Sequence, residues 1–311
     1  MKLVDFYKNF NMVCEIDIAG TFIYNGIKNF DNMESFSNEC DVFHVLYPLA
    51  VGIERLQKVL LVLLEAFPVK VTDEEIEIFE KSLITHSHQE LHARISAKVP
   101  LEFNPHQNEF LQVLTEFYEK FRYDRFNISP NCQKDRDLLV AFLAKRLNIE
   151  IKVNAGFMNT PNSTQIKKFV GRIVGGIART YYSMIRDQAL TLNLYTYEVR
   201  YDSAAYKLFL SELKDNSFQE LLFNERIALA EYLVYLLKFD NGDTTRDFII
   251  KKVEPLDLDL DDSEIFFGGL CKGHVPTTLV DAVECQYEDL EHPTERLNMI
   301  DLLSSQKLFL R

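Results

Sequence analysis

Apolar residues recur at helical spacing along most of this chain, and this periodicity limits the possible folds more than any other feature. Only 11 of the 311 residues are glycine and 9 are proline. Such scarcity disfavours both disorder and turn-rich β architecture. The sequence therefore predicts an all-α protein, a helical bundle with long antiparallel helices and a smaller C-terminal helical region.

Prolines divide this pattern into elements. Pro68, Pro100 and Pro130 each stop a helix, because proline cannot continue the backbone hydrogen-bond ladder. The predicted helices are, in chain order, residues 42–67, 72–98, 104–129, 133–147, 164–198, 204–214, 218–239, 277–290 and 294–310. Residues 251–273 are expected to form an irregular acidic connection. We therefore expect a bundle domain of residues 1–240 and a second region, 241–311, that holds the acidic connection and the C-terminal helices.

The charge balance and the cysteines limit the partners. With 34 basic and 47 acidic residues the formal net charge is −13, so any contact with RNA needs a local basic face. The five cysteines are far apart and lack CxxC spacing, which is typical of reduced thiols in a cytoplasm. No secretory signal and no apolar run of membrane-spanning length is visible. We predict a cytoplasmic protein with no membrane partner and no cofactor.

Four ionisable residues on apolar helices are candidates for catalysis. Glu54 and Lys58 are four residues apart, which suits an ion pair, either structural or part of a site on a mostly apolar helix. His88 and His92 have the same spacing, which would let two imidazoles share a metal, but no third ligand is evident. An imidazole also exchanges protons near neutral pH. We predict no metal site, and we take His88, His92, Glu54 and Lys58 as the candidate catalytic set.

A second group of residues is basic. Arg122 and Arg125 share one face near a helix C-terminus, where cations are favourable whatever the function. A stripe of cations also follows one face of the predicted helix 164–198. These cations either pair with acidic helices of the same chain or bind an anionic ligand such as the RNA backbone. The candidate RNA-binding residues are Arg122, Arg125, Lys168, Arg172, Arg179 and Arg186.

Glycines interrupt that same long helix. Gly171, Gly175 and Gly176 are interior to it, and neither a preceding strand nor a GxxxxGK[ST] pattern makes them a phosphate loop. Small residues let two helices approach closely. We therefore predict a close helix crossing at these glycines, of a kind that would also suit a subunit contact.

Four segments resemble the HEPN superfamily of prokaryotic helical proteins. They are GIERLQK, THSHQELHARI, FYEKFRYDRFN and NLYTYEVRYDSAAY, and together they extend over residues 42–210. The resemblance implies a helical bundle that forms a homodimer. It also implies roles in RNA cleavage, in toxin–antitoxin pairs and in phage defence.

The usual catalytic motif of that superfamily is missing. Many HEPN ribonucleases share an arginine followed, after four to six residues, by a histidine, and these residues of two subunits meet at the dimer interface. None of the seven histidines here has an arginine at that distance before it. Two hypotheses follow: an RNA-binding or RNA-cleaving protein of the defence or toxin type with degenerate or rearranged residues, or a non-enzymatic helical module for protein–protein interaction. If the chain is an enzyme, we expect a metal-independent endoribonuclease.

Overall fold

The computed structural model describes residues 4, 7–8, 12–67, 70–123, 126, 133–153, 158–194, 209, 218–239, 253–259, 262–271 and 275–304. The chain divides into two compact units, Met1–Gln219 and Glu220–Arg311. Within the described ranges the regular elements are helices, and the β structure is one isolated bridge between Ser35 and Pro161. The predicted all-α fold is confirmed.

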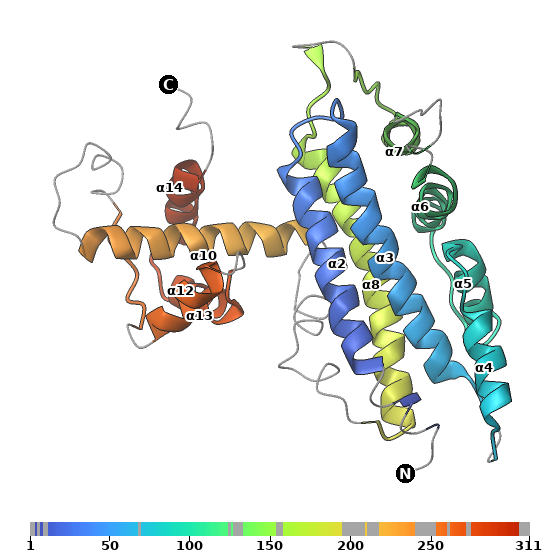
Figure 1. Ribbon diagram of the computed structural model, residues 1–311. Helices are drawn as coiled ribbons and strands as arrows, with labels where there is room; N and C mark the ends of the chain where they lie inside the picture. The colour runs from blue at the N-terminus through green and yellow to red at the C-terminus, as the bar shows by residue number, and fades with distance from the viewer. Residues whose placement is uncertain are drawn as a thin grey trace. The chain divides into compact units, whose positions relative to one another are not determined.

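Three long helices form the centre of the first unit: α2 (Met12–Asn32), α3 (Glu39–Leu64) and α8 (Thr164–Thr191). They lie side by side, with α2 antiparallel to α3 and α8 (Figure 1). Two glycines let α2 and α3 approach closely. A Cβ at Gly52 would lie 2.6 Å from Ile23 Cγ1, and one at Gly26 would lie 2.6 Å from Leu49 Cγ. Helix α2 was not among the predicted helices, although among the described helices it makes the most extensive contact with α3.

Helix α3 is the most deeply buried element of this unit. Asn38 caps its start by accepting a hydrogen bond from the backbone N–H of Cys40, at 3.0 Å. Most of its side chains are buried, because α2, α5, α6, α7 and α8 all pack against it. The prediction of one continuous helix here is confirmed, with bounds that lie three residues earlier in the chain. Polar side chains on such a helix must find partners inside the protein.

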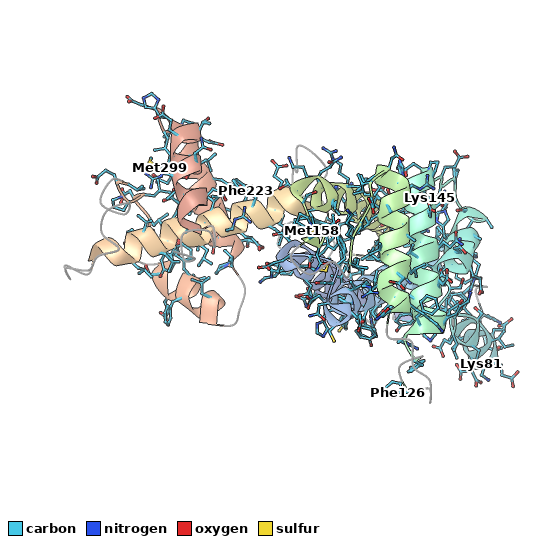
Figure 2. The ribbon with its side chains drawn as sticks, turned by 90° about the horizontal axis from the view of Figure 1, so that it is seen from above. Lys81, Phe126, Lys145, Met158, Phe223 and Met299 are labelled. Carbon is cyan, nitrogen blue, oxygen red and sulfur yellow. The ribbon has the colours of Figure 1, made fainter. Side chains whose placement is uncertain are left out.

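Shorter helices lie on the other side of α3: α4 (Asp73–Ser82), α5 (His88–Ser96), α6 (Pro105–Glu116) and α7 (Lys134–Leu147) (Figure 1). Lys81 lies on α4 at the edge of this unit (Figure 2). The prediction of a single helix over residues 72–98 is wrong. The chain leaves α4 at Leu83 and enters α5 after Ser87, whose hydroxyl accepts a hydrogen bond from the N–H of Glu90. Ser87 therefore acts as an N-cap inside the predicted helix.

The third predicted helix changes its winding near its end. After α6 the chain continues as a π-helical turn, η2 (Phe117–Phe121), in which the N–H of Arg122 donates to the carbonyl of Phe117. Turns of π-helix are rare in proteins, and those that occur often lie at functional sites. The predicted continuation beyond Phe126 lies outside the described residues, whereas the predicted helix 133–147 is confirmed as α7.

Helix α8 buries the apolar face that its sequence pattern predicts, including Ile166, Ile173, Ile177 and Tyr181. A Cβ at Gly176 would lie 2.5 Å from the amide nitrogen of the Gln107 side chain, so this glycine faces α6. The atoms this close belong to the end of a flexible side chain, and the close helix crossing stays a prediction. The helix ends at Thr191, earlier than the predicted residue 198, and the predicted helix 204–214 lies outside the described residues except for Phe209.

The second unit contains α10 (Phe218–Phe239) from its third residue onward, together with α12 (Ser263–Cys271), α13 (Thr277–Glu288) and α14 (Pro293–Ser304). The bounds of α10 agree with the prediction. Figure 2 shows Phe223 on α10 and Met299 on α14. The expectation of an irregular connection over residues 251–273 is wrong for α12, which is helical. Leu256 and Leu258 are buried, whereas Asp257 and Asp259 between and after them are exposed, so this acidic stretch contributes one face to the core.

A buried ion pair joins three helices of the second unit. The Glu231 side chain of α10 is fully buried, and Arg296 of α14 donates to both of its oxygens at 2.7 Å. The hydroxyl of Tyr287 on α13 donates to the same carboxylate at 2.6 Å. The charge that burial would otherwise destabilise is thus fully hydrogen-bonded.

Among the described helices of the chain, none has the length and apolar character needed to cross a membrane.

Candidate functional site

A polar cluster lies where α3 meets the segment between α4 and α5 and the π-helical turn. The carboxylate of Glu54 accepts from Lys58 Nζ at 2.5 Å through Oε1, and its Oε2 lies 3.1 Å from Nδ1 of His86. The Glu54 side chain is only 10% exposed, whereas that of His86 is 45% exposed. The buried carboxylate of Glu54 is therefore within hydrogen-bond distance of the imidazole ring of a solvent-accessible histidine. We call Glu54, Lys58, His86, Tyr118 and Arg122 the Glu54 cluster.

The local structure explains why these residues meet. Glu54 and Lys58 are one turn apart on α3, so both project from the same face. His86 reaches Glu54 because the chain is not helical between α4 and α5. Tyr118 lies within the π-helical turn, and Arg122 is the residue that follows it. Both features that build the cluster, a break and a π-turn, interrupt regular α-helix.

Aromatic rings surround the cationic end of the cluster. The ring of Tyr118 lies edge-on to that of His86, with 4.9 Å between centroids. The Arg122 guanidinium lies 3.9 Å from the Tyr118 ring centre and 4.3 Å from that of Tyr123. Tyr123 is 60% exposed, and Phe126, which points away from the helices, is 83% exposed (Figure 2). Arg122 of the cluster thus contacts the rings of Tyr118 and Tyr123, and the exposed rings of Tyr123 and Phe126 follow it in the chain.

The electrostatics of the cluster favour an anionic ligand. Lys58 and Arg122 carry two positive charges against the single carboxylate of Glu54, in a chain whose net charge is −13. Burial, and then the negative charge of Glu54, raise the pKa of the Tyr118 hydroxyl, so it stays protonated and able to donate. Nδ1 of His86 is used by Glu54, and its Nε2 makes no hydrogen bond to the described residues. A ligand that reaches the cluster therefore meets an imidazole nitrogen beside cations.

His88 is placed differently from the prediction that it is catalytic. Its side chain is completely buried, and Nδ1 lies 3.1 Å from Oε1 of Gln57, which is also completely buried. Burial lowers the pKa of His88 from 6.5 to about 4, although the negative charge of Glu54 acts in the opposite direction, so the ring is neutral near pH 7. In this conformation no ligand reaches it.

His92 lies one turn further along α5 and is half-buried. Its Nδ1 is 2.9 Å from the hydroxyl of Tyr181, and its ring stacks on Phe103 at 4.7 Å. Burial lowers the pKa of His92. The two histidines thus have separate partners despite their four-residue spacing. Among the described residues no three histidine, cysteine or acidic side chains gather as a metal site requires.

The predicted RNA-binding cations do not all lie together. Arg122 belongs to the Glu54 cluster, and Arg125 lies outside the described residues. The four cations of α8 extend over about 27 Å of helix at 1.5 Å per residue. Lys168 and Arg172 are exposed. Arg179 is half-buried, its Nε donates to the carbonyl of Gly175, and burial lowers its pKa. Nε of Arg186 lies 3.7 Å from the carboxylate of Asp187.

A polar pocket of about 410 Å³ lies elsewhere in the first unit, where α2 ends and α3 begins. It holds none of the predicted site residues. Its lining is Asn29, Asn32, Met33, Glu34, Ser35, Ser37, Asp41 and His44.

Comparisons of this chain with protein-family models, with curated proteins and with solved structures find no match. The chemistry of the Glu54 cluster thus rests on its own geometry. His86 was predicted to lie on one continuous helix with His88 and His92, and it was not among the candidate residues because only the other two have four-residue spacing. The Ser87-x-x-Glu90 spacing was the signal of the helix start that places His86 in a bend.

Proposed function

We propose that this chain is a HEPN-like protein that binds and cleaves RNA without a metal, with His86 as the proton-transferring residue. The observation that carries the proposal is the pair of Glu54 and His86, with an accessible imidazole on a buried carboxylate. Lys58 and Arg122 supply positive charge beside it. A base, an orienting acid and cations in one half-buried place are what metal-independent phosphoryl transfer needs.

The proposed reaction uses the ribose itself as nucleophile. Nε2 of His86 takes the proton of a 2′-hydroxyl, and the 2′ oxygen then forms a bond to the adjacent phosphorus. The bond from phosphorus to the 5′ oxygen breaks, that oxygen takes a proton from solvent, and a 2′,3′-cyclic phosphate remains. Glu54 orients the ring and stabilises the imidazolium that forms, as a carboxylate does for a catalytic histidine. Lys58 and Arg122 offset the charge that grows on the phosphate oxygens.

The exposed rings favour RNA over a simple anion. Tyr123 follows Arg122 directly in the chain and Phe126 follows it by four residues, and both rings are largely exposed. Aromatic side chains beside arginine are typical of surfaces on which unpaired bases stack. The resemblance to HEPN proteins implies the same class of ligand, although His86 replaces the usual arginine–histidine motif in this proposal. A defence or toxin role and a cytoplasmic location belong to the same proposal.

A cleavage assay on the full chain tests the proposal. Purified protein is incubated with a single-stranded RNA at low salt with EDTA. His86→Asn keeps a donor where Nδ1 meets Glu54 but removes Nε2, and we expect it to lower the rate at least about 100-fold. His44→Asn, an exposed histidine of α3, is the matched control and should stay within about 3-fold of wild type.

The same assay separates the histidines. Loss of cleavage in His92→Asn with full activity in His86→Asn would assign the chemistry to His92 and overturn the proposal for His86. Light scattering of the purified chain tests the homodimer, which the HEPN resemblance implies; a monomer at micromolar concentration would contradict that part.

The second candidate function is a non-enzymatic interaction module. It is favoured by α12, on which Ile265 and Phe267 are 56% and 61% exposed. Under this alternative the wild-type chain leaves RNA intact, and a double Ile265→Ser, Phe267→Ser variant loses a partner that the wild type binds. Cleavage that depends on His86 would contradict it.

A further inference from the structure

A buried hydrogen-bond network lies directly behind the Glu54 cluster. It consists of Gln57, His88, Tyr181 and His92, and we call it the Gln57 network. Gln57 follows Glu54 by three residues on α3, and His88 follows His86 by two. Gln57, His88 and Tyr181 are all completely buried. The network therefore joins the same two segments that carry the proposed catalytic pair.

The direction of each bond follows from one carbonyl group. The backbone oxygen of His88 can only accept, so the Gln57 side-chain atom 2.9 Å from it is the amide nitrogen. The second N–H of this nitrogen points to the Tyr181 hydroxyl at 3.0 Å. The Gln57 oxygen must then face Nδ1 of His88, at 3.1 Å. Because that oxygen can only accept, Nδ1 of His88 carries the proton.

The rest of the network follows in the same way. The Tyr181 oxygen accepts from Gln57, so its own proton goes to Nδ1 of His92, 2.9 Å away. Burial raises the pKa of Tyr181, so this proton is present. Neutral His92 then has its proton on Nε2, the opposite tautomer to His88. Both amide hydrogens of Gln57 and the Tyr181 hydroxyl are used, whereas Nε2 of His88 has no hydrogen-bond partner among the described residues. The two bonds between Gln57 and His88 hold this pair in one arrangement.

The segment that carries His86, residues 83–87, is not helical. Apart from the contact of His86 with Glu54, its side-chain bonds are local: Thr85 donates to Glu90, and Ser87 caps α5. The start of α5 is also held by the N–H of Gln89, which donates to Thr115 of α6. The paired contacts of Gln57 with the ring and the carbonyl of His88 tie the start of α5 to α3. We propose that Gln57 and His88 are positioning residues, which hold His86 at hydrogen-bond distance from Glu54. This inference rests on the proposed function of His86.

Kinetics on the full chain test the positioning role. His88→Leu removes both ring nitrogens, and a displacement of about 1 Å at a reacting group costs about 100-fold in rate. We expect kcat to fall about 30- to 100-fold with KM within about 2-fold, because ligand binding by Lys58 and Arg122 is unchanged. His88→Asn places an amide donor where Nδ1 lies and should recover most of kcat. Tyr181→Phe, which leaves both bonds between Gln57 and His88 intact, is the matched control and should keep kcat near wild type.

A spectroscopic readout keeps the test independent of activity. In ¹⁵N-labelled wild-type protein the His88 signal should show the proton on Nδ1. The His86 ring signal should carry a shift from the Tyr118 ring, present in wild type and His88→Asn and lost in His88→Leu. Absence of cleavage by wild type would refute the proposed function alone. A folded His88→Leu protein with an unmoved His86 signal and, where wild type is active, with wild-type kcat would overturn the positioning role, as would a proton on Nε2 of His88.

Discussion

Acid should destabilise the first unit through the buried ring of His88. Burial lowers the pKa of His88 to about 4, whereas in the unfolded chain the ring has its ordinary pKa of 6.5. Between pH 6.5 and pH 4 the unfolded chain therefore binds a proton at His88 that the folded chain does not bind. The stability contributed by this difference is fully present above pH 6.5 and is lost as the pH falls from 6.5 towards 4.

The size of the effect follows from the two pKa values. Each unit of difference is worth about 1.4 kcal/mol, so the complete loss is about 3 kcal/mol. Between pH 7.5 and pH 4.5 the expected loss is about 2 to 3 kcal/mol. Protonation would also put an N–H on Nε2, which is buried and has no hydrogen-bond partner among the described residues.

The assay compares wild type with His88→Asn, which cannot titrate at this position. Urea unfolding is followed at both pH values by pulse hydrogen exchange of peptides from α3, so that the first unit is observed alone. Other groups titrate equally in both proteins, so the difference between the two free energies of unfolding isolates His88. We expect that difference to change by about 2 to 3 kcal/mol between the two pH values. A change below about 0.5 kcal/mol would show that His88 is not buried as described.

Three other predictions follow. Arg122→Ala should weaken RNA binding about 10-fold and reduce the slope of log K against log salt by about 1, as measured by fluorescence anisotropy; an unchanged slope would exclude a phosphate contact. Arg296→Leu should destabilise the second unit by about 3 to 5 kcal/mol, because Glu231 is left buried and unpaired, and adding Glu231→Leu should restore part of this loss in urea unfolding; a double variant no more stable than the single one would contradict the reasoning. Gly52→Ala should destabilise the first unit by about 1 to 3 kcal/mol through overpacking, whereas Gly268→Ala, with open space around it on α12, should be neutral or stabilising; equal thermal shifts for both would refute the close crossing.

Helices with strong boundaries were predictable from the sequence. The bounds of α10 agree with the prediction, and α7 differs from it by one residue. The buried face of α8 also agrees with the prediction, because its Ile and Val residues recur every three or four positions, as one face of a helix requires. Local periodicity sufficed for these three helices, apart from the C-terminal end of α8.

Breaks inside an apolar pattern were not predictable in the same way. Residues 85–90 (THSHQE) carry no apolar side chain, and within this gap the cap at Ser87 marks the start of α5, although one continuous helix was predicted across it. The π-turn at Phe117 has no signal of its own in the sequence. These two irregular places bring His86 and Arg122 to Glu54, and the candidate site therefore lay where the pattern is least informative. Glu54 and Lys58 were predictable as a pair, since their spacing is local.

The most direct test of the central claim is the chemistry of the RNA ends. A single-stranded RNA is incubated with the full chain in EDTA, and the products are identified by mass spectrometry. We predict a 2′,3′-cyclic phosphate at each cut, no cut where the 2′-hydroxyl is methylated, and no product above background with His86→Asn. Cleavage that persists at methylated positions, or at the wild-type rate in His86→Asn, would contradict a reaction in which His86 takes the proton of the 2′-hydroxyl.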